Sequence, residues 1–221
     1  MTRVREPQQD RSRATRAKLL DAALVCLAEV GWAGSTVSVI AERARISRGA
    51  LQHYFPTREE LFAAAFAHVA EGRLAQVERE ADRLGSTPER TEAVLTMLSG
   101  LYAGPLFRAA LQLHSAAAAD ESLRPVVASS EARVNAEVHR VALALLDVDE
   151  SLPGVRELVQ GSLDLIRGLA LADVLTDDSR RRSRVLRQWA ATLDVALGAA
   201  EMLGREGAGA AGSAAGGRRL P

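Results

Sequence analysis

The stretch that decides the fold runs from Thr36 to Leu61 and reads TVSVIAERARISRGALQHYFPTREEL. It predicts two short helices, at 37–44 and 48–54, joined by a tight turn. Apolar residues fall where two such helices would face each other, and the small Ala41 falls where their axes would cross most closely. The apolar positions are Val37, Ile40, Ala44, Ile46, Leu51 and Tyr54. This spacing is typical of a helix-turn-helix, which holds its second helix at a fixed angle for the major groove of DNA.

The residues at the ends of the two helices agree with this interpretation. Thr36 and Ser47 directly precede them, and both residue types are favoured N-caps. Arg45 occupies the turn, where the backbone tends to be left-handed and glycine is usual, so it costs about 1–2 kcal/mol. The pattern leaves one alternative open, a plain pair of short amphipathic helices.

Length and composition limit the class of protein. A chain of 221 residues, 48% hydrophobic and 25% charged, is long enough for one large domain or two small ones with a buried core. An apolar stretch as long as any in the chain, 61–67, is far shorter than a membrane span. Cys26 is the single cysteine, so no internal disulfide can form, and we expect a reducing, cytoplasmic location.

Charge is concentrated at one end of a chain that is neutral as a whole. Residues 1–58 contain ten Arg and Lys against five Asp and Glu, a net charge of +5, and the rest carries −5. This asymmetry indicates an anionic partner for the first segment only, although a solvated face of ordinary kind gives the same pattern.

The remainder of the chain has helical periodicity, as in Val94, Met97, Leu98 and Leu101, and predicts an all-α fold. About nine helices are expected, at 12–30, 37–44, 48–54, 58–83, 88–102, 105–118, 124–147, 154–175 and 179–203. We expect a helix-turn-helix, DNA-binding domain at 1–57 whose first part, 1–11, is a flexible arm, and a second helical domain at 58–203, for which ligand binding and dimerisation are implied by a family resemblance. A flexible Gly/Ala tail is expected at 204–221.

Residues 16–62 resemble the DNA-binding domain of the TetR/AcrR family of transcriptional repressors. The residues that carry the resemblance are Ala22, Ala23, Gly31, Thr36, Ile40, Ala41, Ser47, Gly49, Leu51, Tyr54, Phe55 and the run from Thr57 to Leu61. Three positions depart from the family pattern: Arg45 replaces a turn glycine, Gln52 a tyrosine that often touches phosphate, and Arg58 a lysine. The Gln52 change puts that family contact in doubt, while the docking mode is retained.

The expected recognition helix at 48–54 presents polar residues on its outer side. Arg48 and Gln52 are the candidates for reading bases, because Arg pairs with guanine and Gln with adenine through two hydrogen bonds each. Gly49 allows close approach of the backbone to the groove. The candidate phosphate contacts are Thr36, Ser47, His53, Thr57 and Arg58, with Arg45 and the N-terminal Arg11, Arg13 and Arg16 as nearby cations.

A homodimer is expected, since one recognition helix buries too little surface for tight specific binding. The helices at 154–175 and 179–203 are apolar on more than one face, and the resemblance implies dimerisation through these last two helices as a four-helix bundle. A fully buried core helix is the alternative. The candidate interface residues are Leu158, Leu165, Leu169, Ala172, Leu186, Trp189, Leu193 and Leu197.

The resemblance also implies a pocket for a small-molecule effector in the middle helices. The candidate ligand contacts are Met97, Leu101, Tyr102, Phe107, Leu111, His114, Asn135, Val138, Asp164 and Arg167. This largely apolar set favours a hydrophobic or aromatic ligand, which would release the repressor from its operator by favouring a dimer that no longer fits the groove spacing. Ordinary core or surface roles are the alternative for each residue.

No pattern of catalytic or metal-binding residues appears in the sequence. The four histidines are far apart, and Cys26 has no adjacent histidine, so it is expected to be structural. We therefore expect neither enzymatic activity nor a cofactor, metal or membrane partner. The alternatives are an all-helical ligand-binding or interaction module without operator binding and, less favoured, a helical enzyme.

Overall fold

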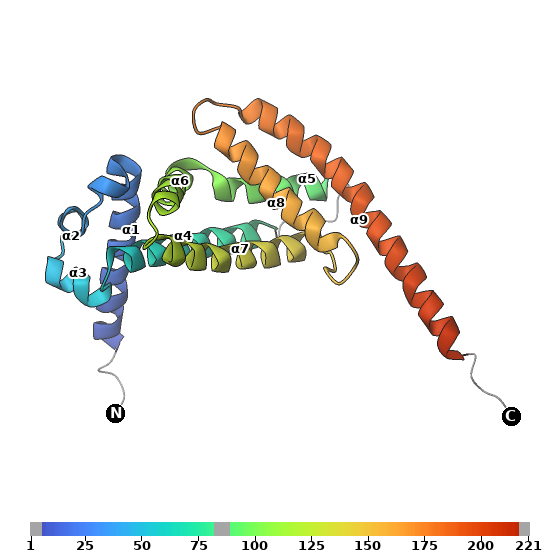
Figure 1. Ribbon diagram of the computed structural model, residues 1–221, viewed down its shortest axis with the longest axis horizontal. Helices are drawn as coiled ribbons and strands as arrows, with labels where there is room; N and C mark the ends of the chain where they lie inside the picture. Colours follow the sequence, from blue (N-terminus) through green and yellow to red (C-terminus); the bar gives the residue numbers. More distant parts are fainter. Residues whose placement is uncertain (1–5, 82–88, 217–221) are drawn as a thin grey trace. The chain divides into compact units, whose positions relative to one another are not determined.

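The computed structural model describes the backbone of residues 6–81 and 89–216 and the side chains of 11–81 and 89–205. The described residues form nine α-helices and one short 3-10 helix, without a strand, which confirms the expected all-α fold (Figure 1). No single helix among them is long and apolar enough to cross a membrane. The elements are α1 (Glu6–Gly34), α2 (Val37–Ala44), α3 (Arg48–Tyr54), α4 (Arg58–Ala81), α5 (Arg90–Ser99), η1 (Gly100–Tyr102), α6 (Gly104–Ala119), α7 (Arg124–Leu146), α8 (Val155–Ala172) and α9 (Ser179–Gly216).

The two ends of the chain are more helical than the sequence predicted. α1 begins at Glu6, so part of the arm expected at 1–11 is helical; Pro7 fits a first helical turn because its missing N–H needs no partner there. α9 continues to Gly216 through most of the expected tail, because its alanines favour a helix while each glycine costs only about 1 kcal/mol. Residues 1–5 and 217–221 lie outside the described part.

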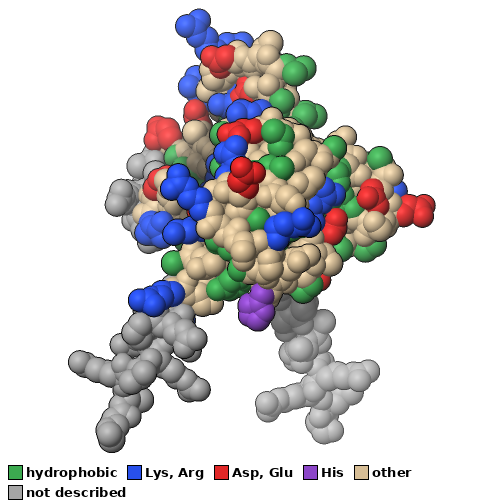
Figure 2. All heavy atoms as spheres, turned by 90° about the vertical axis from the view of Figure 1, so that its left-hand side faces the viewer, with side chains coloured by type: hydrophobic (Ala, Val, Ile, Leu, Met, Phe, Trp, Pro, Cys, Tyr) green, Lys and Arg blue, Asp and Glu red, His purple; other side chains and the backbone are tan. Residues whose placement is uncertain are grey.

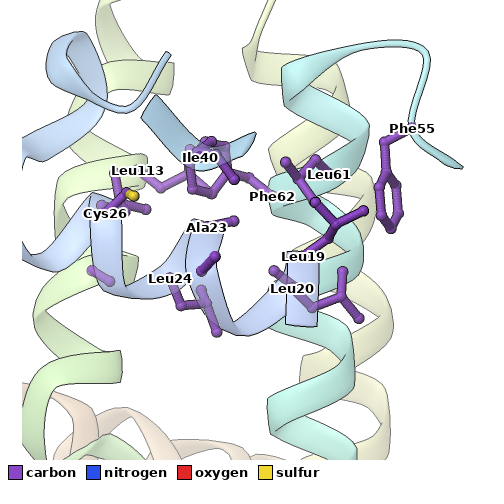
Figure 3. Packing of buried hydrophobic residues seen from close by; sticks show 14 of the residues in the cluster. Leu19, Leu20, Ala23, Leu24, Cys26, Ile40, Phe55, Leu61, Phe62 and Leu113 are labelled. Atoms are coloured by element: carbon purple, nitrogen blue, oxygen red, sulfur yellow. The ribbon is translucent and has the colours of Figure 1, made fainter. Parts of the chain in front are cut away.

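Contacts divide the chain into two compact units, and the first contains residues 1–74 and 103–136. Its core joins α1 to the short helices and to α4, α6 and the start of α7 (Figure 3). Leu19, Leu20 and Leu27 of α1 and Phe62 of α4 are almost fully buried there. α6 packs on α1 and contributes Ala109, Leu113 and Ala117. The predicted domain boundary at 57/58 therefore falls inside one continuous core.

α1 ends in a kink that leads into α2. Gly31 has φ 70°, a left-handed conformation that glycine adopts without a steric penalty. The buried Ser35 donates its hydroxyl proton to the carbonyl oxygen of Gly31 at 2.7 Å. Thr36 follows as the N-cap of α2, so the joint between the two helices is ordered by hydrogen bonds.

The second unit contains residues 75–102 and 137–221. Here α5, α8 and α9 pack against one another, and η1 contacts α5 and α8. The buried residues at these helices include Leu95, Leu98, Val159, Ile166, Leu186 and Leu193. The indole N–H of Trp189 on α9 donates to the hydroxyl of Ser162 on α8 at 2.9 Å, so a hydrogen bond also joins these two helices.

Candidate nucleic-acid interface

The two short helices have the bounds that the sequence predicted, and their caps are the predicted residues. The hydroxyl oxygens of Thr36 and Ser47 accept from the backbone N–H groups of Val39 and Ala50 at 3.3 and 3.2 Å. Arg45 ends α2 in the left-handed conformation, with φ 56° and ψ 44°, and its N–H bonds back to α2. The turn therefore has the geometry expected of a helix-turn-helix, with an arginine in place of glycine.

The inward face of α2 and α3 is the apolar set identified in the sequence. Ile40 and Leu51 are 0% exposed, and Ala41, at the predicted crossing of the helices, is 2% exposed. The other members of the set are half-buried against the same core: Val37, Ala44, Ile46 and Tyr54. These contacts hold α3 on α2 and leave its opposite face uncovered.

That opposite face is polar and open to solvent. All five residues expected there are exposed: Ser47, Arg48, Gly49, Gln52 and His53. A Cβ added to Gly49 would meet no atom within 4 Å, so neither packing nor backbone conformation requires glycine at this position. Basic and acidic side chains are intermixed on the side of the first unit shown in Figure 2.

Three exposed hydroxyl groups lie at the starts of successive helices. Thr57 caps α4 just as Thr36 and Ser47 cap α2 and α3, and its hydroxyl oxygen accepts from the N–H of Glu60 at 3.1 Å. In each cap the hydroxyl oxygen accepts a hydrogen bond from the backbone. The hydroxyl proton can therefore be donated to a phosphate oxygen of DNA. The cap role of Thr57 was not foreseen, although a threonine directly before an apolar helix carries that signal.

The candidate arginines differ in their exposure and in the contacts of their guanidinium groups. Arg45 and Arg48 are exposed. Arg16 is also exposed, but its guanidinium lies 5.4 Å from the ring centre of Phe55. Arg58 differs most from the expectation, because its guanidinium lies 3.8 Å from the ring centre of Trp32 and donates to the Trp32 carbonyl oxygen at 3.2 Å.

Cys26 is 1% exposed in the core of the first unit. Burial raises the pKa of its thiol, while the nearby Arg43 guanidinium acts in the opposite direction. Arg43 itself is paired with Glu29, which joins α2 to α1. Among the described residues, no group of three or more His, Cys, Asp and Glu side chains is arranged to hold a metal ion.

The predicted ligand contacts divide between the two units. Arg167 and Tyr102 are brought together in the second unit, with the guanidinium 5.3 Å from the ring centre. His114 is exposed and engaged at both nitrogens, by the Ala110 carbonyl oxygen at 2.8 Å and the Glu131 carboxylate at 2.7 Å. The exposed Asp164 accepts from Gln160 at 3.2 Å. Of the others, Phe107 and Val138 are buried, and Met97, Leu101, Leu111 and Asn135 are half-buried.

The predicted dimer contacts differ in how much of their surface is exposed in the second unit. Leu186 and Leu193 are 2% and 0% exposed inside the second unit, so their side chains have almost no surface to offer a partner. Leu169 and Leu197 are also buried, Leu158, Leu165 and Trp189 are half-buried, and only Ala172 is exposed. Periodicity alone did not distinguish the inward from the outward side, because both helices are apolar on several faces.

The structure leaves a different set of apolar residues uncovered on α8, α9 and the turn between them. These exposed residues are Leu171, Leu175, Val195, Met202 and Leu203. Gly161 and Gly168 of α8 and Gly198 of α9 have nothing within 4 Å of an added Cβ. The sequence analysis did not single out these five residues as exposed, because the buried leucines of the same helices repeat with similar spacing. Their apolar side chains were the only signal that the sequence offered.

Comparison with known proteins gives matches over the short helices and over most of the chain. Residues 19–65 match a family described as bacterial regulatory proteins, tetR family. The chain is 30% identical to the HTH-type transcriptional regulator CymR of Pseudomonas putida, over 89% of this chain and 96% of that protein. A transcriptional regulator from Pseudomonas aeruginosa PAO1 has a similar fold, with a TM-score of 0.67 at 21% identity over 88% of this chain and 94% of that one. FadR from Bacillus subtilis, solved in complex with stearoyl-CoA, gives a TM-score of 0.62 at 20% identity, over 80% of this chain and 96% of that one.

Proposed function

The chain belongs to the TetR family of bacterial transcriptional regulators, and from this membership we propose that it is a dimeric repressor whose α3 reads operator DNA. The observation that carries the proposal is the two-sided character of α3. Leu51 is fully buried, whereas Arg48 and Gln52 are exposed on the outer side of the same helix. A helix held in this way presents its polar side chains to a major groove.

Base reading is assigned to two side chains of α3. Arg48 presents a planar guanidinium that matches the O6 and N7 atoms of guanine, and the Gln52 amide matches the N6 and N7 atoms of adenine. The open space at Gly49 lets the backbone of α3 approach the groove closely. These three residues supply sequence discrimination.

Phosphate contacts are assigned to groups around α3. The capping hydroxyls of Thr36, Ser47 and Thr57 donate their free protons, and the exposed Arg45 adds a cation in the turn. His53 and Arg16 are further candidates near the end of α3. Contacts of this kind set the orientation of the protein on the duplex without reading its sequence.

The proposal is tested by in vitro selection from a random pool of duplexes. We expect the wild-type protein to recover a site with two half-sites about 34–36 Å apart, or a multiple of that distance. Arg48→Ala then costs about 1–3 kcal/mol and relaxes discrimination at one guanine. A variant that weakens binding to all duplexes equally would contradict the base-reading assignment.

Recovery of no duplex at low salt would contradict DNA binding itself and favour a ligand-binding or interaction module. Arg79→Gln is the matched control, since it removes an arginine that is exposed on α4 outside 36–58. We expect this variant to select and bind the same duplex as the wild-type protein.

Dimerisation is assigned to the exposed apolar residues of α8 and α9. Leu171 and Val195 are 55% and 75% exposed, and large apolar side chains left in water in this way favour burial against a partner. The unoccupied space at Gly161 and Gly168 allows a partner helix to approach α8 closely. The second copy places a second α3 on the other half-site.

A small, largely apolar effector is proposed to control this DNA binding. In FadR of Bacillus subtilis the same fold accommodates stearoyl-CoA. In this chain, the Tyr102 ring and the Arg167 guanidinium stacked on it offer an aromatic surface and a charge from the second unit. The assignment is tested by screening small apolar and aromatic acids for release of the selected duplex. An Arg167→Met variant that responds like the wild-type protein would contradict a role for this pair.

A further inference from the structure

Arg58, the first residue of α4, is engaged by a single residue at the end of α1. Its guanidinium stacks 3.8 Å from the ring centre of Trp32, and its Nη1 donates to the Trp32 carbonyl oxygen at 3.2 Å. Its Nε lies 3.7 Å from the Glu59 carboxylate, and the side chain is only 24% exposed. An arginine suits this double contact because its flat guanidinium stacks and donates at the same time, which a lysine ammonium cannot do.

The ring of Trp32 is held from a second direction by the same helix. Phe62 lies one turn beyond Arg58 on α4, and its ring centre is 5.2 Å from that of Trp32 with the planes tilted by 55°. Residues four apart share one face of a helix, so both contacts come from one turn of α4. Trp32 is therefore fixed to the start of α4 by a cation and an aromatic ring together.

Trp32 stands at the joint that determines where α2 begins. It follows Gly31, whose left-handed φ of 70° bends the end of α1. Beyond it, Ser35 closes the bend by donating to the Gly31 carbonyl oxygen, and Thr36 caps α2. An anchor on Trp32 consequently constrains the position of α2 and of α3, which packs on α2.

Helix α6 lies against the bend between α1 and α2. The Gln112 side-chain oxygen lies 3.0 Å from the place that a Cβ on Gly31 would occupy, so α6 closely approaches the bend. Hydrogen bonds from Ser122 and Leu123 lower the pKa of Asp120 at the α6–α7 turn, and the charge of Arg58 adds to this. Arg58 therefore contacts α1 and its neighbour on α4, and its charge also acts on Asp120 at the α6–α7 turn.

We propose that Arg58 is a positioning residue for DNA reading, which orients α2 and α3 through Trp32 and makes no phosphate contact of its own. This inference rests on the proposed DNA binding. It assigns to the first residue of α4 a different role from the phosphate contact expected from the sequence.

The salt dependence of DNA binding distinguishes the two roles. The probe is the duplex recovered by in vitro selection with the wild-type protein. A phosphate contact predicts that Arg58→Lys keeps its affinity and that Arg58→Gln lowers the slope of log K against log salt by about 0.9 for each bound copy, or about 1.8 for the dimer. The positioning role predicts that both variants lose affinity by about tenfold, or 1.4 kcal/mol, with an unchanged slope.

Two controls accompany these variants. Arg79→Gln removes an exposed charge from the same helix and is expected to change neither affinity nor slope. Trp32→Leu is expected to lose as much affinity as Arg58→Gln, and the double variant no more than either, because the two residues act as one unit. Wild-type affinity of Arg58→Lys, a reduced slope for Arg58→Gln, or additive losses would each overturn the proposal.

Fluorescence tests the contact without DNA. The chain has two tryptophans, so a Trp189→Phe background leaves Trp32 as the only emitter. In that background, Arg58→Gln is expected to shift the emission to longer wavelength and to increase acrylamide quenching, while far-UV circular dichroism remains helical. Unchanged emission would overturn the proposal even if the duplex binds. Failure of the wild-type protein to recover any duplex would instead contradict the proposed function, and the emission would still report on the contact.

Discussion

Helix α3 and the α8–α9 pair both expose one face to solvent, but the chemistry of the two faces is opposite. α3 presents Arg48 and Gln52, whose groups form directional hydrogen bonds. α8 and α9 present Leu171, Val195 and Met202. Their apolar side chains stabilise a complex only when they are buried away from water. Two surfaces built from the same kind of element therefore differ in the chemistry of the partner that they suit, which is why DNA reading is proposed for one and dimerisation for the other.

The two faces share one feature: each contains a glycine at a position where no contact within the chain requires one. Gly49 on α3 and Gly168 on α8 both have nothing within 4 Å of an added Cβ. Glycine within a helix costs roughly 0.5–1 kcal/mol relative to alanine. The proposed close approach of DNA to α3 and of a partner helix to α8 would give both glycines a role.

The largest effect is expected for an inward residue of α9. Leu193→Ala empties a fully buried position and is expected to lower the free energy of unfolding by about 2–5 kcal/mol, measured by urea denaturation. Val195→Ala, two residues away and 75% exposed, is the matched control and should change the free energy by less than about 0.5 kcal/mol at concentrations where the protein is monomeric. Equal losses would remove the distinction between the two faces of α9.

Val195→Arg tests the outward face of the same helix. A charge in an apolar interface is expected to separate the dimer, as measured by sedimentation velocity. Duplex affinity should then fall by about a hundredfold, because the second half-site is no longer linked to the first. Ala144→Arg adds the same charge at an exposed position of α7 and should leave both the dimer and the affinity intact.

Gly49→Ala sharpens the comparison on α3. The variant is expected to raise the melting temperature slightly, since alanine favours the helix and its Cβ meets no protein atom. Duplex affinity should fall by about tenfold, equivalent to 1.4 kcal/mol, because the methyl group occupies space needed by the groove. An unchanged affinity would show that the backbone of α3 does not approach the bases closely.

The smallest effect is expected in the turn between α2 and α3. Arg45→Gly relieves a left-handed residue and should raise the free energy of unfolding by about 1 kcal/mol. It also removes a cation from each copy, so the salt slope of duplex binding should fall by about 0.9 per copy, or about 1.8 for the dimer. Asp147→Gly relieves the other left-handed non-glycine residue of the described chain and should give a similar gain in stability with unchanged DNA binding.

The helix-turn-helix was predictable to the residue because several independent signals agreed. Ile40, Ala41 and Leu51 fix the inward face, and Thr36 and Ser47 mark where the helices begin. A short helix with one apolar face packs with that face toward the core. The exposed positions of Arg48 and Gln52 follow from that packing.

The role of Arg58 and the outward face of α9 were not predictable in this way. Trp32 lies in another helix, and no local pattern shows that its ring meets the Arg58 guanidinium. Along α9, inward Leu193 and outward Val195 are both apolar, so periodicity does not decide which one meets a partner. Such distinctions depend on contacts between segments far apart in the sequence.

The participation of α6 in the core of the first unit has a consequence for protein engineering. Leu113 and Ala117 cover α1 residues that would otherwise face water, so a fragment ending at residue 57 would lose part of its own interior. A designer who transplants the operator specificity of this protein into another regulator must move α6 together with α1–α3, or redesign the host helix that replaces it. Recombination between relatives is subject to the same restriction, because a crossover directly after α3 separates residues that pack in one core.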